Sequence, residues 1–519
     1  MIVLATVNAV EMRGITKRFG SVVANNNVNL DIRQGEILSL LGENGSGKTT
    51  LTNMLSGIYF PDEGEIKVNG RPVTIASPKD AFDLGIGMIH QHFKLVDVLT
   101  AAENILLGLK EEGRLNLKAA SEKIRKICDK YGFVVDPEKK IYDMSVSEKQ
   151  TVEIVKVLYR GADILILDEP TAVLTPQETR RLFDVMRKMR DDGKSIIIIT
   201  HKLHEVMEIS DRVAVLRKGE YIGDIETANT NPQQLTDMMV GHAVTLNIDR
   251  PDPVNPQKRI EVKNLTVRNE NGVKALNKAT FDIYSGEILG IAGVAGSGQR
   301  ELLEAIAGLH HPDSGKIIYY KEDGSVKRLD TLDPLSIVDE GVMLSFVPED
   351  RFGMGLVGSM NITENIMLRS YRQGNGPLVQ YKGPRKLSKK IVKELEVVTP
   401  DIDHTPVSRL SGGNVQKVLV GREIAFEPSV LMSAYAVRGL DINTSYTIYN
   451  LLTEQKMKGV AVVYVGEDLD VLLELCDRIM VLCAGRVNGI VDARTTTKEE
   501  VGLLMTNLQK KEEKKEETK

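Results

Sequence analysis

The order of apolar and polar positions along the chain predicts short buried strands that alternate with helices. Residues 164–167 and 196–199 are unbroken apolar runs, with the length expected of buried parallel strands. A similar run, residues 37–41, is followed by a glycine-rich stretch and then by the helix-like segment 51–56. This alternation of strand and helix patterns predicts an α/β fold.

The chain also carries an internal duplication. The tetrapeptide at residues 35–38, Gly-Glu-Ile-Leu, returns 251 residues later at 286–289, and Glu-Asn-Ile at 103–105 returns at 364–366 with an offset of 261. An ordered series of matches indicates a tandem repeat with a short insertion. We expect a first domain over residues 8–246, a Pro-rich linker over 247–258, a second domain over 259–508 and a charged Lys/Glu tail over 509–519.

Composition narrows the function classes. A net charge of -5 gives no basic surplus of the kind that marks a dedicated nucleic-acid binder, so no nucleic-acid partner is expected. The three cysteines lack zinc-site spacing and form no disulfide framework, which fits a reducing cytosol. The longest purely aliphatic run is far below the roughly 18 residues of a membrane span, and no signal-peptide pattern opens the chain. We therefore expect a cytosolic protein whose membrane role, if any, comes through partners.

The glycine-rich stretch between the strand at 37–41 and the following helix matches the phosphate-loop pattern without a mismatch. Glycines let backbone N–H groups wrap phosphate oxygens, and the helix that follows adds its positive end. Lys48 is expected to reach the β- and γ-phosphates of ATP, and the Thr49 hydroxyl to ligate Mg²⁺. The predicted nucleotide contacts of this loop are Gly42, Glu43, Asn44, Gly45, Ser46, Gly47, Lys48, Thr49 and Thr50.

Two carboxylates and a histidine follow the other apolar runs. Asp168 and Glu169 end the strand at 164–167, 120 residues beyond Lys48. Asp168 is suited to hold Mg²⁺, directly or through water, and Glu169 to polarise the attacking water. His201 follows the run at 196–199 and is a candidate sensor of the γ-phosphate.

With this phosphate loop, these carboxylates and the duplication, both halves resemble the ABC ATPase family. The resemblance covers nearly the whole chain. It implies a tandem of two P-loop NTPase domains, each with a mixed, mainly parallel sheet, an antiparallel β subdomain and a helical signature subdomain. It also implies that Gln91 contacts Mg²⁺ and the transporter and takes part in catalysis with Lys48, Glu169 and His201. Phe19 matches the aromatic residue that stacks on adenine, although the sequence alone leaves a core position equally open.

The family signature, which contacts the γ-phosphate bound to the opposite half, is intact only in the second half. There it reads Leu-Ser-Gly-Gly-Asn at 410–414, so the expected nucleotide contacts are Ser411, Gly412, Gly413 and Asn414. In the first half, Ser147 stands where the second glycine belongs and Glu148 follows it. We expect Ser147 to weaken the close approach of backbone to phosphate and Glu148 to add an unfavourable negative charge.

The catalytic residues of the first half have no counterparts in the second. The repeat places Gln299, Arg300, Ala434, Tyr435, Glu467, Glu349 and Glu270 at the positions of Lys48, Thr49, Asp168, Glu169, His201, Gln91 and Phe19. The first-half loop would therefore complete one site with the second-half signature, and the other site would be degenerate on both faces. Pairing within one chain is favoured by the short linker, and pairing between two chains remains the alternative.

The whole chain looks like the fused double ATPases of bacterial simple-sugar and nucleoside importers. Residues 90–93 and 171–175 favour the nucleoside-type branch over ribose- or galactose-type sugars. The resemblance implies two transmembrane permease subunits docked near Gln91 and Glu349, an extracytoplasmic substrate-binding lipoprotein acting indirectly, and a peripheral position on the cytoplasmic face of the membrane. The alternative is a soluble tandem ABC ATPase that acts on the ribosome. Such proteins have a long charged helical linker and two competent sites, which this chain lacks.

Overall fold

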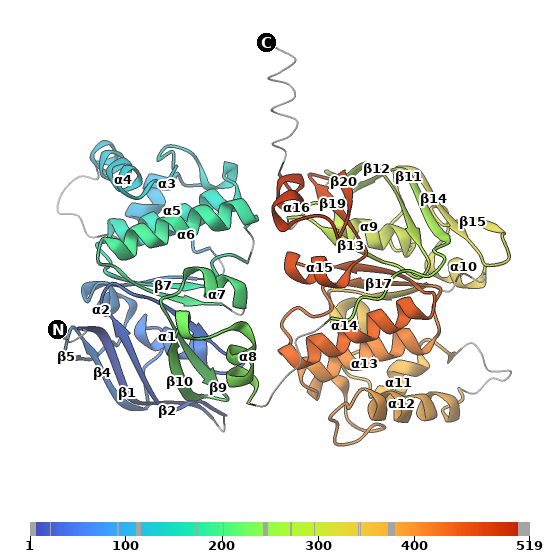
Figure 1. Cartoon of the computed structure of the whole chain (residues 1–519), viewed down its shortest axis with the longest axis horizontal. Helices are drawn as coiled ribbons and strands as arrows, with labels where there is room; N and C mark the ends of the chain where they lie inside the picture. The colour runs from blue at the N-terminus through green and yellow to red at the C-terminus, as the bar shows by residue number, and fades with distance from the viewer. Residues whose placement is uncertain are drawn as a thin grey trace, which may run out of the picture. The chain divides into compact units, whose positions relative to one another are not determined.

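The computed structural model describes residues 7–506, except 21, 91–92, 110–115, 173, 201, 242–247, 270–271, 295, 341, 343 and 372–378. Its contacts divide the chain into two units, Met1–Thr245 and Leu246–Lys519 (Figure 1). Each unit is built from a six-stranded sheet, a four-stranded sheet and helices, and the units are described separately below.

The six-stranded sheet of the first unit is parallel except for one edge strand. Its order is β10 (Glu220–Glu226), β9 (Arg212–Arg217), β3 (Ile37–Leu41), β8 (Ser195–Ile199), β7 (Ile164–Asp168) and β6 (Ile86–Ile89). Only β10 runs antiparallel to its neighbour. The strands expected at 37–41, 164–167 and 196–199 are therefore confirmed as adjacent parallel strands.

The second unit repeats this order strand for strand. Its large sheet runs β20 (Arg486–Asp492), β19 (Arg478–Cys483), β13 (Ile288–Ala292), β18 (Ala461–Val465), β17 (Val430–Ala434) and β16 (Leu344–Val347). Again only the edge strand, β20, is antiparallel. The matching topology confirms the duplication that the sequence indicates.

Each unit also has an antiparallel four-stranded sheet. In the first unit the order is β2 (Val22–Arg33), β1 (Asn8–Phe19), β4 (Glu63–Val68) and β5 (Arg71–Val73). In the second unit it is β12 (Lys274–Tyr284), β11 (Lys258–Arg268), β14 (Ser314–Tyr320) and β15 (Val326–Arg328). These sheets are the expected antiparallel subdomains.

The helices follow the same repeat. Those of the first unit are α1 (Lys48–Leu55), α2 (Pro78–Asp83), α3 (Ala101–Leu106), α4 (Leu117–Tyr131), α5 (Val146–Tyr159), α6 (Pro176–Asp191), α7 (Leu203–Ile209) and α8 (Pro232–Val240). Those of the second are α9 (Gln299–Ile306), α10 (Pro334–Asp339), α11 (Ile362–Met367), α12 (Lys382–Glu394), α13 (Gly412–Ala425), α14 (Ile442–Met457), α15 (Leu469–Leu475) and α16 (Lys498–Leu504). The helices α3–α5 and α11–α13 form the expected signature subdomains.

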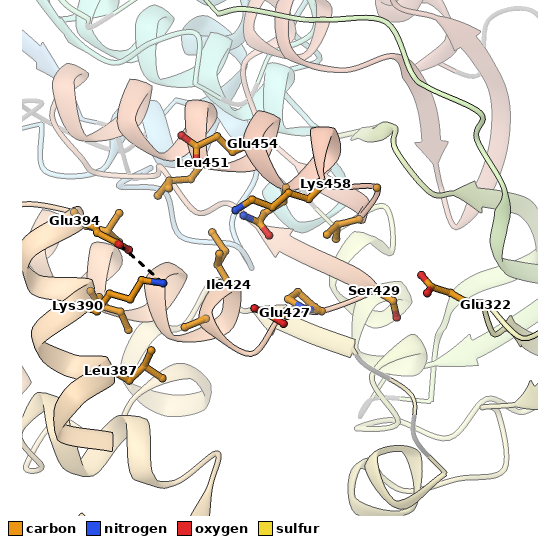
Figure 2. Close-up of a pocket in the computed structure, with 18 of the residues that line it drawn as sticks. Glu322, Leu387, Lys390, Glu394, Ile424, Glu427, Ser429, Leu451, Glu454 and Lys458 are labelled. Carbon is orange, nitrogen blue, oxygen red and sulfur yellow. Dashed lines mark ion pairs between the residues drawn. The ribbon is translucent and has the colours of Figure 1, made fainter. Parts of the chain in front are cut away.

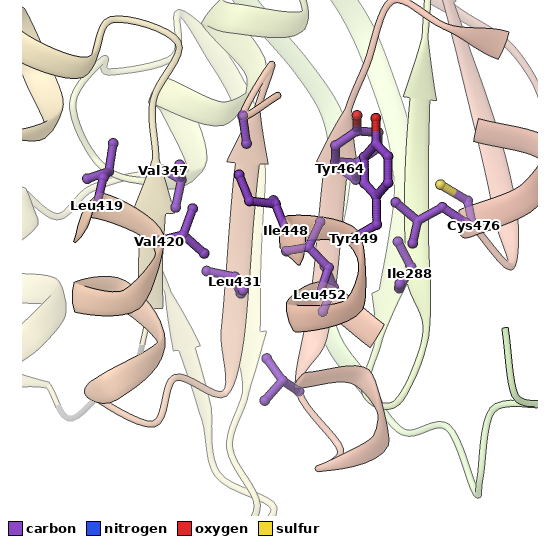
Figure 3. Packing of buried hydrophobic residues seen from close by; sticks show 14 of the residues in the cluster. Ile288, Val347, Leu419, Val420, Leu431, Ile448, Tyr449, Leu452, Tyr464 and Cys476 are labelled. Atoms are coloured by element: carbon purple, nitrogen blue, oxygen red, sulfur yellow. The ribbon is translucent and has the colours of Figure 1, made fainter. Parts of the chain in front are cut away.

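Alternating side chains bury both faces of each large sheet. On β17, Leu431 belongs to the core cluster that includes Ile448 and Leu452 of α14 (Figure 3), whereas Val430 and Met432 belong to the cluster on the antiparallel-sheet side. A strand that is buried on both faces favours apolar residues throughout, and β17 departs from this only at Ser433, which is fully buried.

The Pro-rich linker packs onto the second unit. Arg250 donates hydrogen bonds to the carbonyls of Leu473 (2.6 Å) and Cys476 (2.7 Å). Lys456, with a side chain only 1% exposed, lies 2.7 Å from Asp477 and donates to the carbonyl of Pro251. The linker is thus held by side chains of the second unit rather than left as a free spacer.

A cavity of about 780 Å³ lies in the second unit, away from the carboxyl ends of its parallel strands (Figure 2). Ser429 and Val460, which precede β17 and β18, line it, so it opens at the amino-terminal ends of these strands. Lys390 and Glu394 pair across one wall at 3.9 Å.

Candidate nucleotide site

The phosphate loop of the first unit connects β3 to α1, at the carboxyl ends of the parallel strands. Gly47 caps α1 with φ 97°. A Cβ at Gly42 would lie 2.2 Å from the carbonyl oxygen of Leu216, and one at Gly47 would lie 2.3 Å from that of Ala24. Both contacts are shorter than any side chain tolerates, so the tight path of this loop requires glycine.

Lys48 lies over the loop that it follows. Its Nζ donates to the carbonyl oxygens of Gly42 (2.7 Å) and Glu43 (2.9 Å). Burial lowers the pKa of Lys48, while the charges of Glu169, Asp168 and Glu43 act to raise it. The ammonium group is therefore held, partly desolvated, at a point where an anion would meet it directly.

Asp168 and Glu169 lie at the carboxyl end of β7. Glu169 has φ 46°, and its N–H donates to the carbonyl of Ile199 on β8 at 2.8 Å. Burial, and then the charge of Glu169, raise the pKa of Asp168 to about 6, and Lys48 opposes this rise. Two carboxylates and one ammonium thus lie together at the edge where open α/β sheets bind ligands.

Several features of the loop fit a bound phosphate group. Ser46 is 3% exposed, and its Oγ has no hydrogen-bond partner within the described part of the chain. Thr49 is exposed at the start of α1. Both hydroxyls lie beside the glycine turns that precede α1, where they are placed to contact phosphate oxygens and a metal ion.

Phe19 is 43% exposed at the end of β1, which decides against a core position. Its ring meets Tyr59 edge-on at 5.2 Å between centroids, and Lys17 Nζ lies 5.6 Å from its centroid. A stacking role for Phe19 stays a prediction. Gln91 and His201 lie outside the described residues, so their roles also stay predictions.

In the second unit the positions equivalent to Lys48, Asp168 and Glu169 carry neutral side chains. Tyr435 has φ 50° and donates its N–H to the carbonyl of Val465 at 2.9 Å, as Glu169 does to Ile199. Gln299 begins α9 as Lys48 begins α1, and its Nε2 donates to Val294 (3.2 Å), the counterpart of Glu43. The structure therefore places Gln299 and Tyr435 where the sequence repeat predicts, while Glu270 lies outside the described residues.

The two signature segments both begin helices. In the second unit Ser411 caps α13, its Oγ accepts from Asn414 Nδ2 at 2.9 Å, and Gly412 is exposed. In the first unit Ser145 and Glu148 form a capping box at α5, and Glu148 also pairs with Lys139 at 2.7 Å. The negative charge expected at Glu148 is thus partly neutralised by Lys139. Sequence reasoning missed this role, although the Ser-x-x-Glu spacing of a capping box signals it.

Sequence reasoning also missed the partners of Arg438. Its guanidinium pairs with Glu349 and lies 3.5 Å from Glu467. No local pattern signals these pairs, because the three residues meet only when β16, β17 and β18 lie side by side.

No helix in the described ranges has both the length and the apolar content needed to cross a membrane.

Comparison with known proteins decides the family. A family model described as ABC transporter matches residues 25–172 and 276–433, one copy in each unit. The chain belongs to the ABC transporter ATP-binding family. As a member of this family it binds ATP and is an ATPase.

Two curated relatives share nearly the whole length of the chain. It is 44% identical to the guanosine import ATP-binding protein NupO of Bacillus subtilis, over 97% of this chain and 98% of that protein. It is 41% identical to the nucleoside import ATP-binding protein NupA of Lactococcus lactis, over 97% of this chain and 99% of that protein.

A solved archaeal ribosome recycling factor, aABCE1, in complex with the ribosomal stalk protein aP1, is 17% identical with a TM-score of 0.57, over 90% of this chain and 87% of that one. At that identity the likeness shows the fold alone.

Proposed function

We propose that this chain is the ATPase subunit of an importer whose solute is a nucleoside, with a simple sugar as the next candidate. The observation that carries this proposal is the identity of 44% and 41% to proteins named for guanosine and nucleoside import, each over 97% of the chain. A relative named for glucose import, from Haloferax volcanii, is 38% identical, which is why sugars rank second.

Hydrolysis is assigned to a site built on the first-unit loop. Gly42 to Thr50 hold the phosphates, with Lys48 on the β- and γ-phosphates. Glu169 orients and polarises the attacking water, His201 senses the γ-phosphate, and Gln91 takes part in catalysis through the metal ion. Thr49, Asp168 and Gln91 would hold Mg²⁺, which supplies charge neutralisation on the phosphate oxygens. Phe19 stacks on the adenine.

The second-unit signature completes this site. Ser411, Gly412, Gly413 and Asn414 present a helix start with small, exposed groups, which suits contact with a γ-phosphate held by the first-unit loop. Pairing of the two halves of one chain brings these parts together. The other pairing joins the neutral second-unit loop to Ser147 and Glu148 and is catalytically silent.

We place the chain on the cytoplasmic face of the membrane, bound to two transmembrane permease subunits through the loops at Gln91 and Glu349. An extracytoplasmic binding lipoprotein delivers the solute to the permease. ATP-driven closure of the halves and their reopening after hydrolysis would move the permease subunits.

The experiment that tests this proposal combines recovery of partners with uptake. The tagged chain is purified from its native cell in mild detergent, and a strain lacking the chain is complemented with wild type, Glu169→Gln or the control Asp163→Asn. Asp163 is exposed one residue before β7 and pairs with Lys194 at 2.6 Å. We expect two multi-span proteins to co-purify, and labelled guanosine uptake to be restored by wild type and D163N but not by E169Q. Recovery with ribosomal subunits, or equal uptake with E169Q, would contradict the proposal.

A further inference from the structure

Arg438 joins three loops of the second unit that follow three neighbouring parallel strands. Its guanidinium pairs with Glu349 after β16 and lies 3.5 Å from Glu467 after β18, while Arg438 itself follows β17. In the other direction, Arg351 Nη2 donates to the carbonyl oxygen of Arg438. One arginine therefore ties together the carboxyl ends of β16, β17 and β18.

The two glutamates of this cluster lie at the positions that correspond to two predicted site residues of the first half. Glu349 lies two residues after β16 as Gln91 lies two residues after β6, and Glu467 lies two residues after β18 as His201 does after β8. Arg438 corresponds to Ala172, which lies four residues after β7 as Arg438 does after β17. The second half thus carries acids at the positions of the predicted Mg²⁺ contact, Gln91, and the predicted γ-phosphate sensor, His201, and adds a cation between them.

The second half also lacks the counterparts of the phosphate-binding cation and of the metal-binding carboxylate. Gln299 is neutral at the position of Lys48, and Ala434 offers no ligand at the position of Asp168. Burial, followed by the charges of Glu467 and Glu349, raises the pKa of Tyr435 to about 12, while Arg438 acts against this rise. Here two carboxylates are balanced by a side chain of the protein itself.

The loop after β16 is also rigid in itself. Asp350 Oδ1 accepts from the N–H groups of Phe352 (3.2 Å) and Gly353 (2.8 Å), and residues Arg351–Gly355 form a single π-helical turn. The Arg438–Glu349 and Arg351–Arg438 contacts attach this turn to the end of β17. These hydrogen bonds and ion pairs join the turn and the end of β17 into one block.

We propose that Arg438 is a positioning residue that holds the loop Glu349–Gly355 in one arrangement whether or not nucleotide is bound. It acts where a metal ion and a γ-phosphate would act in a competent half, because it supplies the positive charge that links the loops. The inference rests on the proposed function only for the statement that this loop faces a permease subunit. The second half then gives that subunit a fixed docking surface, and nucleotide-driven change is confined to the first half.

The test measures amide hydrogen exchange of residues 349–356 in the purified full-length chain. Arg438→Met keeps the aliphatic length and removes the charge, so we expect these amides to exchange roughly three- to tenfold faster, as the loss of two exposed ion pairs allows. Arg438→Lys keeps the charge but cannot reproduce the contacts that two guanidinium nitrogens make, so its exchange should be slower than that of R438M and no slower than that of wild type. The matched control is Arg385→Met, because Arg385 is also about half exposed in the second unit and pairs with Asp403 at 3.0 Å.

A second measurement tests independence from nucleotide. In Lys48→Met, which removes the first-site cation, ATP and Mg²⁺ should leave the exchange of residues 349–356 unchanged. The proposal is overturned if R438M exchanges like wild type, if R438K exchanges like R438M, or if ATP slows this loop in the K48M chain. Unchanged protection of β17 amides shows that each variant is folded. None of these measurements involves a permease, so their failure would leave the import proposal, which is tested by uptake, untouched.

Discussion

Asp168 should lower the stability of the first unit when no metal ion is present, and Asp168→Asn should therefore raise it. Burial and Glu169 raise the pKa of Asp168 to about 6 in the folded chain, against about 3.9 in an unfolded chain. Because the folded state binds this proton more tightly, stability is highest below the unfolded pKa and falls as the pH rises through the folded pKa. A shift of about two units corresponds to about 3 kcal/mol, and solvent screening of this partly exposed group reduces it to roughly 1–2 kcal/mol.

The assay is hydrogen exchange of the β7 and β8 amides in EDTA, with each variant compared with wild type at the same pH. At pH 8 the free energy of opening should be about 1–2 kcal/mol larger in D168N, and at pH 4 the difference should nearly vanish. ATP hydrolysis should be lost, because the amide is a poor metal ligand. The control D163N changes an exposed carboxylate beside the same strand and should shift stability by less than about 0.5 kcal/mol. A D168N chain that is less stable than wild type at pH 8, or equally stabilised at both pH values, would refute the electrostatic reasoning.

The remaining predictions concern two glycines of the phosphate loop, Glu169 and two buried glutamines of the second unit. Gly47→Ala should destabilise the first unit and weaken ATP binding by at least about tenfold, because its Cβ would meet the Ala24 carbonyl at 2.3 Å. Gly45→Ala, with φ 81° and nothing within 4 Å, should cost only about 1 kcal/mol in denaturant titration. Glu169→Gln should slow steady-state hydrolysis ~10²-fold or more while ATP still binds, and equal turnover would remove Glu169 from the mechanism. Gln455→Met should stabilise the second unit by about 1 kcal/mol, because Gln455 is 2% exposed and its Nε2 has no partner among the described residues. Gln299→Lys should destabilise the second unit by roughly 2 kcal/mol, measured by hydrogen exchange of the α9 amides, because it buries a cation without the carboxylates that Lys48 has beside it. Unchanged exchange would contradict this reason.

The sequence was sufficient for features carried by contiguous residues. The loop at Gly42–Thr49, the acids after β7 and the duplication all follow from short motifs and their spacing, and the fold confirms the strands and helices around them. The capping role of Glu148 also has a sequence signal, because a serine followed three residues later by a glutamate is typical of a capping box.

Contacts between distant residues were not accessible in the same way. Arg438 and Glu349 are 89 residues apart, and Arg250 reaches carbonyls more than 220 residues away. Such pairs depend on the strand order of a parallel sheet and on where the linker packs. A short sequence motif predicts neither of these. A proline-rich segment predicts stiffness, but the buried Lys456 that holds it gives no local signal.

The second half has neutral residues at all three positions that correspond to Lys48, Asp168 and Glu169. Electrostatics explains why these three charges are replaced together. In the first half Lys48 is buried, and the charges of Glu169 and Asp168 favour its ionised form. Removing the lysine alone would leave two neighbouring carboxylates without a cation, and removing the carboxylates alone would leave a buried ammonium uncompensated. The second half has neither an uncompensated ammonium nor unpaired carboxylates at these positions, because Gln299, Ala434 and Tyr435 are neutral. Gln299 also keeps a hydrogen bond to the loop carbonyl of Val294. Glu349 and Glu467 lie at the rim, where Arg438 pairs with Glu349 and lies 3.5 Å from Glu467. We propose that a half with internal pairs in place of ligand-binding charges keeps its shape without nucleotide. On the proposed function, such a half serves the first half by presenting the signature helix that Ser411 caps.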